Sequence, residues 1–173
     1  MSDVLEAIKN RRSIRKYKDT MVPDEIIDKI IEAGTYAATG MGKQSPIIIA
    51  VTNKELRDKL SAMNAKFMGA DIDPFYGAPV VLIVLADKSR PTYLYDGSLV
   101  MGNLMLEAEA QGIGSCWIHR AKEEFEMPEF KAVLRDLGIE GEWEGIGHCA
   151  VGYIDGDMPK AAARKDGRVF WAE

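Results

Sequence analysis

The stretch Val80-Val81-Leu82-Ile83-Val84-Leu85-Ala86 is a continuous run of aliphatic, mostly β-branched residues. Such a run is typical of a strand that is buried on both faces of a sheet. Residues 47–51 form a second run of the same kind, and residues 115–119 and 146–153 also fit short strands bounded by turn residues. These four segments predict a central sheet.

Apolar residues at helical spacing recur around these strands. A short helix is expected to end near Asn10, and a longer one begins at Pro23 and extends towards Ala38. Residues 95–111 are apolar over most of the helix circumference and stop before Gly112, so this helix must be buried on several sides, within one core or against another subunit. Two further helices are marked by Leu56, Leu60, Met63 and Phe67, and by Phe130, Val133, Leu134 and Leu137. Strands that alternate with helices suggest a doubly wound parallel sheet.

Length and composition indicate one domain covering residues 1–173, because 47% hydrophobic residues can fill a substantial core. The 22 basic and 27 acidic residues leave a net charge of −5, which argues against nucleic acid or an anionic membrane as partner. The longest apolar segment, residues 78–86, is too short to span a bilayer. Two cysteines without a disulfide pattern favour a reducing compartment. We therefore expect a cytoplasmic protein.

Two common site types are disfavoured by context. The loop Gly40-Met41-Gly42 lacks the third glycine of a dinucleotide fingerprint, and it follows a helix and opens a strand, which is the reverse of that motif. Cys116 with His119, and His148 with Cys149, could supply metal ligands. Residues that are adjacent or three apart on a strand point to opposite faces, so buried free thiols are favoured and no metal is expected.

Residues 9–18 hold six of the basic residues. If this segment is extended, Arg11, Ser13, Arg15 and Tyr17 share one face. Two guanidinium groups and a hydroxyl can then bind a phosphomonoester, whereas the alternative is a solvated basic stretch anchored by Ile14.

Residues 159–173 end in Val169-Phe170-Trp171, and a free tail has no need of adjacent bulky apolar residues. The tail is therefore expected to dock on its own subunit or on a partner.

Three segments, in their order and spacing, resemble the nitroreductase family of flavin enzymes. They are Arg11-Arg12-Ser13-Ile14-Arg15-Lys16-Tyr17, Ala37-Ala38-Thr39-Gly40-Met41-Gly42-Lys43-Gln44-Ser45-Pro46 and Gly112-Ile113-Gly114-Ser115-Cys116-Trp117-Ile118. The resemblance covers most of the chain. It implies an α+β fold with a mixed, largely antiparallel central sheet flanked by helices, in place of the parallel sheet. It also implies an interlocked homodimer with helix 95–111 at its core and residues 159–173 as an arm that reaches the partner subunit.

The same resemblance implies FMN, held without a covalent bond between the two subunits. Arg11 and Ser13 match the phosphate-binding residues, with Arg12 beside them. Arg15 matches a cation near the flavin pyrimidine edge, where it would stabilise the negative charge of the reduced ring. The other matching residues are Gly42 and Gln44 in the loop, Trp117, Ile118 and His119 at a strand end, and Arg164 or, as second choice, Lys165 in the tail.

The implied activity is that of an NAD(P)H-dependent FMN oxidoreductase with a ping-pong mechanism and a small-molecule acceptor such as a nitroaromatic or a quinone. The flavin N5 carries the chemistry, so no catalytic side chain is implied, and proton donation by His119 is a minor alternative to a positional role. Gly42, residues 45–47 and His119 depart from the family pattern, and the chain is short, which indicates an open pocket. The alternatives are a reductive dehalogenase or activated-alkene reductase on the same scaffold, or an FMN-binding module without turnover.

Overall fold

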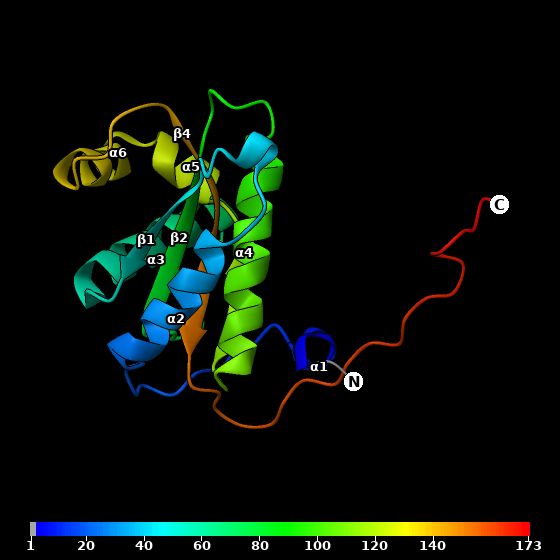
Figure 1. The fold of residues 1–173 in the computed structure, drawn as a ribbon. Helices are drawn as coiled ribbons and strands as arrows, with labels where there is room; N and C mark the ends of the chain where they lie inside the picture. The colour runs from blue at the N-terminus through cyan, green and yellow to red at the C-terminus, as the bar shows by residue number, and fades with distance from the viewer. Residues whose placement is uncertain (1–2) are drawn as a thin grey trace.

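A four-stranded sheet in the order β1-β2-β4-β3 lies at the centre of the computed structural model, which describes residues 3–173 (Figure 1). The strands are β1 (Ile47–Val51), β2 (Val80–Asp87), β3 (Gly114–Ile118) and β4 (Trp143–Gly152). All three pairings are antiparallel. The largely antiparallel sheet of an α+β fold is thus confirmed, and the doubly wound parallel sheet is wrong. The alternation of strands and helices did not reveal the antiparallel direction. The connection over residues 69–79, after α3 (Lys54–Met68), turns the chain back, so β2 runs antiparallel to β1.

Helices cover both faces of this sheet. On one face α2 packs against α4, and α4 contacts β2, β3 and β4; on the other, α3 and α6 contact α5, which lies on β4 (Figure 1). The bounds of the remaining helices are α1 (Asp3–Asn10), α2 (Asp24–Thr35), α4 (Tyr93–Ala110), α5 (Ala121–Glu126) and α6 (Pro128–Asp136). Each face of the sheet therefore has its own apolar cluster, and β2 contributes alternate residues to both.

The four predicted strands are present, with shifts at their ends. Residues 80–86 of β2 are all buried, as predicted. β4 begins at Trp143, three residues before the predicted start. β1 differs in environment, because it lies at the sheet edge and exposes Ala50, so the prediction that it is buried on both faces is wrong.

The predicted last helix, marked by Phe130, Val133, Leu134 and Leu137, corresponds to α6, and a second short helix, α5, precedes it. Met127 has an extended backbone and Pro128 starts α6, because a proline disfavours helical geometry in the residue before it and fits a first helical position. The short helix α5 was not predicted. Phe130 and Leu134 are buried as expected, but Leu137 is exposed.

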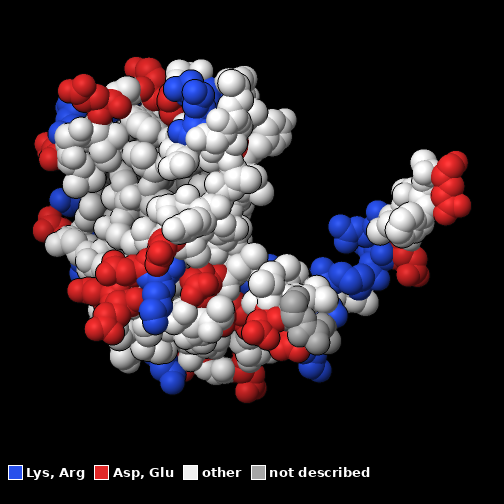
Figure 2. Space-filling view, viewed as in Figure 1, with Lys and Arg blue, Asp and Glu red and all other residues white. Residues whose placement is uncertain are grey.

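Two helices leave apolar residues uncovered. α4 ends as predicted, with Gly112 at a positive φ of 71°, and it buries Met101 and Leu104, but it exposes Leu94, Tyr95 and Leu99. α1 buries no residue and exposes its apolar residues, namely Val4, Leu5 and Ile8. Few charged side chains lie on the surface over α4 and the loop after α2 (Figure 2). Within the single chain, one side of α4, the predicted helix 95–111, is thus buried and its other side is uncovered.

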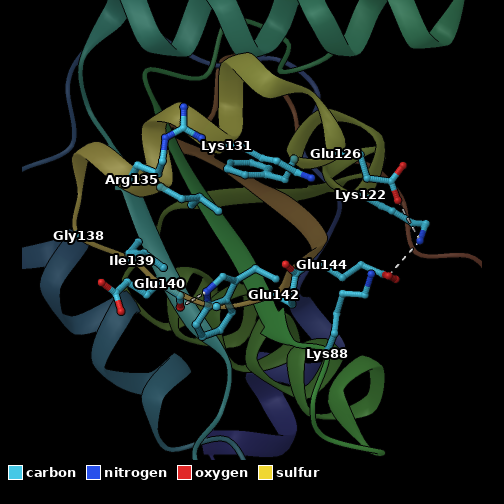
Figure 3. A pocket seen from close by; sticks show the side chains of 14 residues that line it. Lys88, Lys122, Glu126, Lys131, Arg135, Gly138, Ile139, Glu140, Glu142 and Glu144 are labelled. Atoms are coloured by element: carbon cyan, nitrogen blue, oxygen red, sulfur yellow. Dashed lines mark hydrogen bonds and ion pairs between the residues drawn. The ribbon is translucent and has the colours of Figure 1, made fainter.

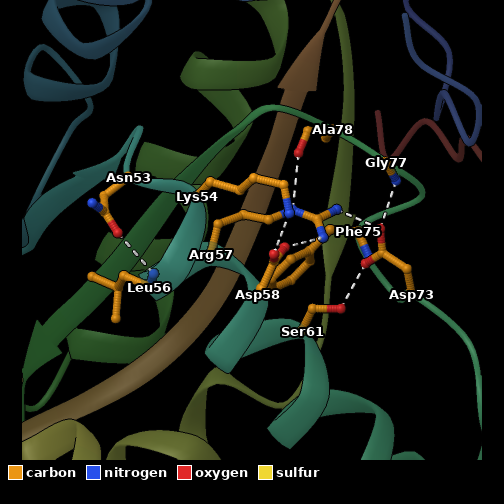
Figure 4. Close-up of polar contacts among 10 residues, drawn as sticks. All are labelled: Asn53, Lys54, Leu56, Arg57, Asp58, Ser61, Asp73, Phe75, Gly77 and Ala78. Carbon is orange, nitrogen blue, oxygen red and sulfur yellow. Dashed lines mark hydrogen bonds and ion pairs between the residues drawn. The ribbon is translucent and has the colours of Figure 1, made fainter. Parts of the chain in front are cut away.

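A buried ionic network attaches α3 to the turn before β2 (Figure 4). Arg57 donates from Nη2 to Asp73 and from Nε to the carbonyl oxygen of Ala78 at 3.1 Å. Asp73 also accepts hydrogen bonds from the Ser61 hydroxyl at 2.7 Å and from the backbone amides of Phe75 and Gly77. Partial burial raises the pKa of Asp73, but these hydrogen bonds outweigh that effect, so the pKa lies below its usual value.

We expect Asp73→Asn to lower the free energy of unfolding by about 1–3 kcal/mol at pH 7, because a charge-assisted network loses its acceptor charge. Since the pKa of Asp73 is lowered in the folded state, its contribution is complete above about pH 4 and is lost as the pH falls through the lowered value. Urea unfolding at pH 7 and pH 3 should therefore show a gap between wild type and variant that shrinks in acid. Glu55→Gln is a matched exposed control; a gap that is independent of pH would contradict the prediction.

None of the helices in residues 3–173 combines the length and the apolar character that a bilayer-spanning helix needs.

Candidate functional site

The basic segment of residues 11–18 runs along the outer edge of β3. Ser13 forms a parallel bridge with Ser115, and the amide of Ile14 donates to the carbonyl oxygen of Ser115 at 3.0 Å. Further on, Tyr17 pairs with Ile154, just after β4. The segment therefore closes this edge of the sheet, and the bridge at Ser13 is the parallel contact in a sheet region that is otherwise antiparallel.

Two residues anchor this segment in the core. Ile14 and Tyr17 are both buried, and the Tyr17 hydroxyl donates to the carbonyl oxygens of Ile14 at 2.9 Å and Ala150 at 3.3 Å. The prediction that Tyr17 shares a face with Arg11 is therefore wrong. Strict alternation fails because the segment forms isolated bridges and not a regular strand, so residues three apart both point inward.

Arg11, Ser13 and Arg15 gather around the thiol of Cys116 on β3. Burial raises the pKa of Cys116, and the charge of Arg15, a hydrogen bond with Ser13 and the charge of Arg11 oppose that rise. Neither the Arg11 nor the Arg15 side chain forms a hydrogen bond or an ion pair with any residue in the range 3–173, although the Arg11 backbone bonds to Ala7 and Arg12. The structure thus brings together three of the predicted binding residues and leaves both guanidinium groups available for an anion.

Arg12 is engaged differently. Its Nη1 donates to the carbonyl oxygens of Lys9, Asn10 and Arg11 at 2.6, 2.9 and 2.9 Å, and its Nε donates to the carbonyl oxygen of Pro159 at 3.1 Å. Two of its three guanidinium nitrogens are therefore already occupied, Nη1 at the end of α1 and Nε at Pro159.

The loop that holds Gly42 and Gln44 has a strained backbone. Met41, Gly42 and Gln44 have positive φ angles of 57°, 64° and 50°. The loop is fixed to the start of α4, because the amide of Gly40 donates to Oδ1 of the buried Asp96 at 3.0 Å. A Cβ atom at position 40 would lie 2.3 Å from Oγ1 of Thr92, so the close approach of the loop to α4 requires glycine there.

The loop of residues 39–44 and the basic segment lie at opposite corners of the protomer. The loop enters β1 at the Leu85 end of β2, whereas Ser13 lies beyond β3 at the level of Val80. Between them lie four inter-strand spacings across the sheet and five residues along the strand direction. Together these two separations correspond to about 25 Å. This distance is longer than an FMN molecule, so the structure does not bring these two groups together within one protomer.

The predicted residues at the end of β3 point in different directions. Trp117 is half-buried on the α4 face, whereas Ile118 is buried on the opposite face beneath α5. Only the backbone of Ile118 can therefore contact a ligand on the α4 side. The His119 side chain is exposed, and its carbonyl oxygen accepts a hydrogen bond from Nδ2 of Asn64 at 2.7 Å.

Arg164 and Lys165 lie in the C-terminal tail, which extends away from the rest of the protomer (Figure 1). Both side chains are exposed, and Arg164 donates only to the carbonyl oxygen of Ala162 within the tail, at 3.1 Å. The structure does not place them near Arg11 in the same protomer.

Comparison with known proteins decides the family. The family model described as "Nitroreductase family" matches residues 8–153. The chain belongs to the nitroreductase family. The range covers the basic segment, the loop and the end of β3, and it stops before the tail.

Two archaeal relatives and one solved structure are similar to this nitroreductase-family chain. A putative NADH dehydrogenase/NAD(P)H nitroreductase of Methanothermobacter thermautotrophicus is 38% identical over 66% of this chain and 60% of its own length. A protein of the same description from Archaeoglobus fulgidus is 33% identical over 80% of this chain and 78% of its own length. The crystal structure of a nitroreductase with bound FMN from Bacteroides fragilis is 30% identical, covers all of both chains and superposes with a TM-score of 0.88.

Three residues that support this nitroreductase site were missed in the sequence. Asp96 fixes the loop at Gly40, and Asn64 holds the carbonyl of His119. Glu124 on α5 is fully buried with His148 on β4, and its Oε2 lies 2.6 Å from Nε2 of that histidine. An acidic residue inside an otherwise apolar helix could have indicated Asp96, since such residues are seldom buried without a partner. The partners of Asn64 and Glu124 lie far away in the chain and left no local pattern.

The two pairs of potential metal ligands are separated in this nitroreductase-family fold. His148 packs against Phe75 on one face of the sheet, and Cys149 belongs to the apolar cluster on the other face. The prediction that these adjacent strand residues point to opposite faces is therefore confirmed. His119 is exposed, whereas Cys116 is buried.

A pocket of about 500 Å³ lies between α5, α6 and the start of β4 (Figure 3). Its floor is apolar, with Phe125, Leu134 and Trp143, and charged side chains of both signs surround it. None of the residues predicted to bind flavin lines this pocket. A smaller hollow of about 220 Å³ is lined by Thr39, Gln44 and neighbouring residues of α2, β1 and α4.

Proposed function

We propose that this chain is an FMN-dependent NAD(P)H oxidoreductase of the nitroreductase type. The observation that carries the proposal is the pair of guanidinium groups, Arg11 and Arg15, that lie on either side of Ser13 at the edge of β3 and have no partner among the described residues. Two positive charges and a hydroxyl suit the doubly charged phosphate of a flavin mononucleotide. The relatives named as NAD(P)H nitroreductases and the similar structure with bound FMN support the same cofactor and electron donor.

The residues present fit a non-covalently bound FMN. Arg11 and Ser13 would hold its phosphate, and Arg15 would lie near the pyrimidine edge, where its fixed charge would favour the reduced ring. When bound, FMN would supply the redox chemistry at its N5 between NAD(P)H and a second substrate. Trp117 and the backbone of Ile118 and His119 orient the ring along the end of β3. The exposed His119 has a positional role, with proton donation as the minor alternative.

The binding site is completed by a second subunit. Gly42 and Gln44 lie about 25 Å from Ser13 in one protomer, so they approach the flavin only from a partner. The uncovered apolar residues on α1 and α4 supply a contact surface for this homodimer. Residues 1–173 then form one domain, and residues 159–173 form an arm that carries Arg164, with Lys165 as second choice, to the phosphate in the partner.

The second substrate is a small planar acceptor such as a nitroaromatic or a quinone, reduced in a ping-pong mechanism. The exposed loop at Gly42 and the exposed His119 side chain support an open, loosely specified site. The buried free thiols of Cys116 and Cys149 agree with a cytoplasmic location.

The visible spectrum of the purified protein, before and after anaerobic addition of NADH or NADPH, tests the proposed function. We expect bound FMN to give a yellow protein whose flavin absorption is bleached by a reduced nicotinamide and restored by a quinone or a nitroaromatic. Restoration only by a halogenated aromatic or an activated alkene would identify a different reaction on this scaffold. A flavin that neither nucleotide bleaches would indicate a binding module, and a colourless protein that ignores added FMN would refute the proposal.

A further inference from the structure

Residues 153–159, here called the root of the C-terminal tail, contact the basic segment, and residues 153–155 pair with it in an antiparallel arrangement. The amide of Lys18 donates to the carbonyl oxygen of Tyr153 at 2.9 Å, and the amide of Asp155 donates to that of Lys16 at 3.1 Å. In the same register, Tyr17 pairs with Ile154, and Lys16 forms an ion pair with Asp155 at 2.6 Å. The basic segment therefore pairs first with β3, at Ser115, and then with residues 153–155, which follow β4.

Arg12 makes the last contact of this arrangement. The backbone pairing stops at Asp155, and further along the tail the side-chain Nε of Arg12 donates to the carbonyl oxygen of Pro159 at 3.1 Å. Beyond Pro159 every residue is exposed, and no hydrogen bond or ion pair joins residues 160–173 to the body within the described chain. The direction in which the tail leaves the protomer is thus set at Arg12.

The other contacts of Arg12 fix its position. Its Nη1 donates to three carbonyl oxygens at the end of α1, those of Lys9, Asn10 and Arg11. One planar group therefore joins the end of a helix to the root of the tail through donors with a fixed relative geometry. A lysine ammonium carries no such rigid fork and cannot hold both sets of carbonyls in one plane.

We propose that Arg12 is a positioning residue that directs the C-terminal arm towards the partner subunit and links arm docking to FMN binding. The inference rests on the proposed function, since it requires a homodimer with FMN between its subunits. Arg12 lies between Arg11 and Ser13, so the residues that contact phosphate and the residue that directs the arm belong to one short segment. Because such coupling is reciprocal, bound FMN tightens the dimer and dimer formation tightens FMN.

The test is a double-mutant cycle between Arg12→Gln and a deletion of residues 160–173 that keeps Pro159. Sedimentation over a concentration series gives the dimer dissociation constant, and quenching of flavin fluorescence gives the FMN dissociation constant. In the full-length chain we expect Arg12→Gln to weaken both about tenfold, which is the loss typical of one charge-assisted hydrogen bond. In the deleted chain, which has no arm to direct, the same substitution should leave the dimer dissociation constant unchanged.

Two further variants separate positioning from general stability. Arg12→Lys keeps the charge and should recover less than half of the lost affinity, because it lacks the fork. Lys18→Gln removes a charge from the same segment but keeps the backbone hydrogen bond from residue 18 to Tyr153, and it should change neither constant. Circular dichroism melting controls for loss of the fold.

Several outcomes would overturn the inference. If Arg12→Gln changed the dimer dissociation constant equally in the full-length and deleted chains, Arg12 would act only by holding the end of α1. Arg12 would be a simple phosphate contact if the Arg12→Lys variant had the dissociation constants of the unaltered protein. The same conclusion would follow if Arg12→Gln weakened FMN binding and left the dimer dissociation constant unchanged. The proposed function fails separately, if the unaltered protein is monomeric and binds no FMN.

Discussion

Arg11→Gln is expected to weaken FMN binding about 10- to 100-fold and to leave riboflavin binding unchanged. The guanidinium group of Arg11 has no hydrogen bond or ion pair within residues 3–173, so the substitution disrupts no side-chain contact of the described chain. The loss reflects one charge-assisted hydrogen bond to phosphate, of about 1.5–3 kcal/mol. Riboflavin lacks the phosphate, so it reports only on the ring site. Fluorescence titration of the apoprotein with both flavins measures the difference.

Lys18→Gln is the matched control, because it removes one positive charge from the same segment beyond the part that lies along β3. It should change FMN affinity less than twofold at physiological salt, where distant surface charges are screened. If Arg11→Gln weakened FMN and riboflavin equally, the variant would have damaged the ring site or the fold. If it weakened neither, the phosphate would lie elsewhere.

Deletion of residues 160–173 is expected to raise the dimer dissociation constant at least 100-fold and to lower the flavin content of the purified protein. Val169, Phe170 and Trp171 are 75%, 86% and 86% exposed in the single chain. Covering each of them on a partner contributes about 1.5–3 kcal/mol before the cost of ordering the tail. Size-exclusion elution across a dilution series and the ratio of flavin to protein absorbance measure the two effects.

A length-matched variant distinguishes the apolar contact from the mere presence of the tail. Replacing Val169, Phe170 and Trp171 by serine keeps Arg164 and Lys165 and should reproduce most of the loss of dimer affinity. Removing only Ala172 and Glu173 should have no effect. An unchanged elution volume and flavin ratio after deletion of residues 160–173 would contradict the arm.

The sheet was predictable because its strands are continuous aliphatic runs. Residues 80–86 of β2 could be identified without their neighbours, since a run of that length must be buried. Strand direction and order could not be read from such runs, because they depend on where residues 69–79 return the chain. The short helix α5, which lies before Pro128, was missed because the apolar spacing that predicted a helix begins only at Phe130.

The candidate site was predictable only in part. The resemblance grouped Arg11, Ser13 and Arg15, and all three lie close to Cys116, but their roles in binding a flavin stay predictions. The resemblance could not show that Arg12 is occupied by the carbonyls at the end of α1. The prediction that Tyr17 shares a face with Arg11 was wrong because isolated β-bridges, unlike a regular strand, do not require successive side chains to point to opposite faces. Asp96 and Asn64 act over long sequence separations, so no local spacing points to them.

The separation between the loop at Gly42 and the segment at Arg11 has a consequence for dilute solutions. In the proposed dimer each site draws on both chains, so a lone subunit, however well folded, would carry two half-sites and no complete site. Turnover would then scale with the square of protein concentration once most subunits are unpaired. A mixed pair, one chain defective at Arg11 and the other at Gln44, would keep one working centre of two.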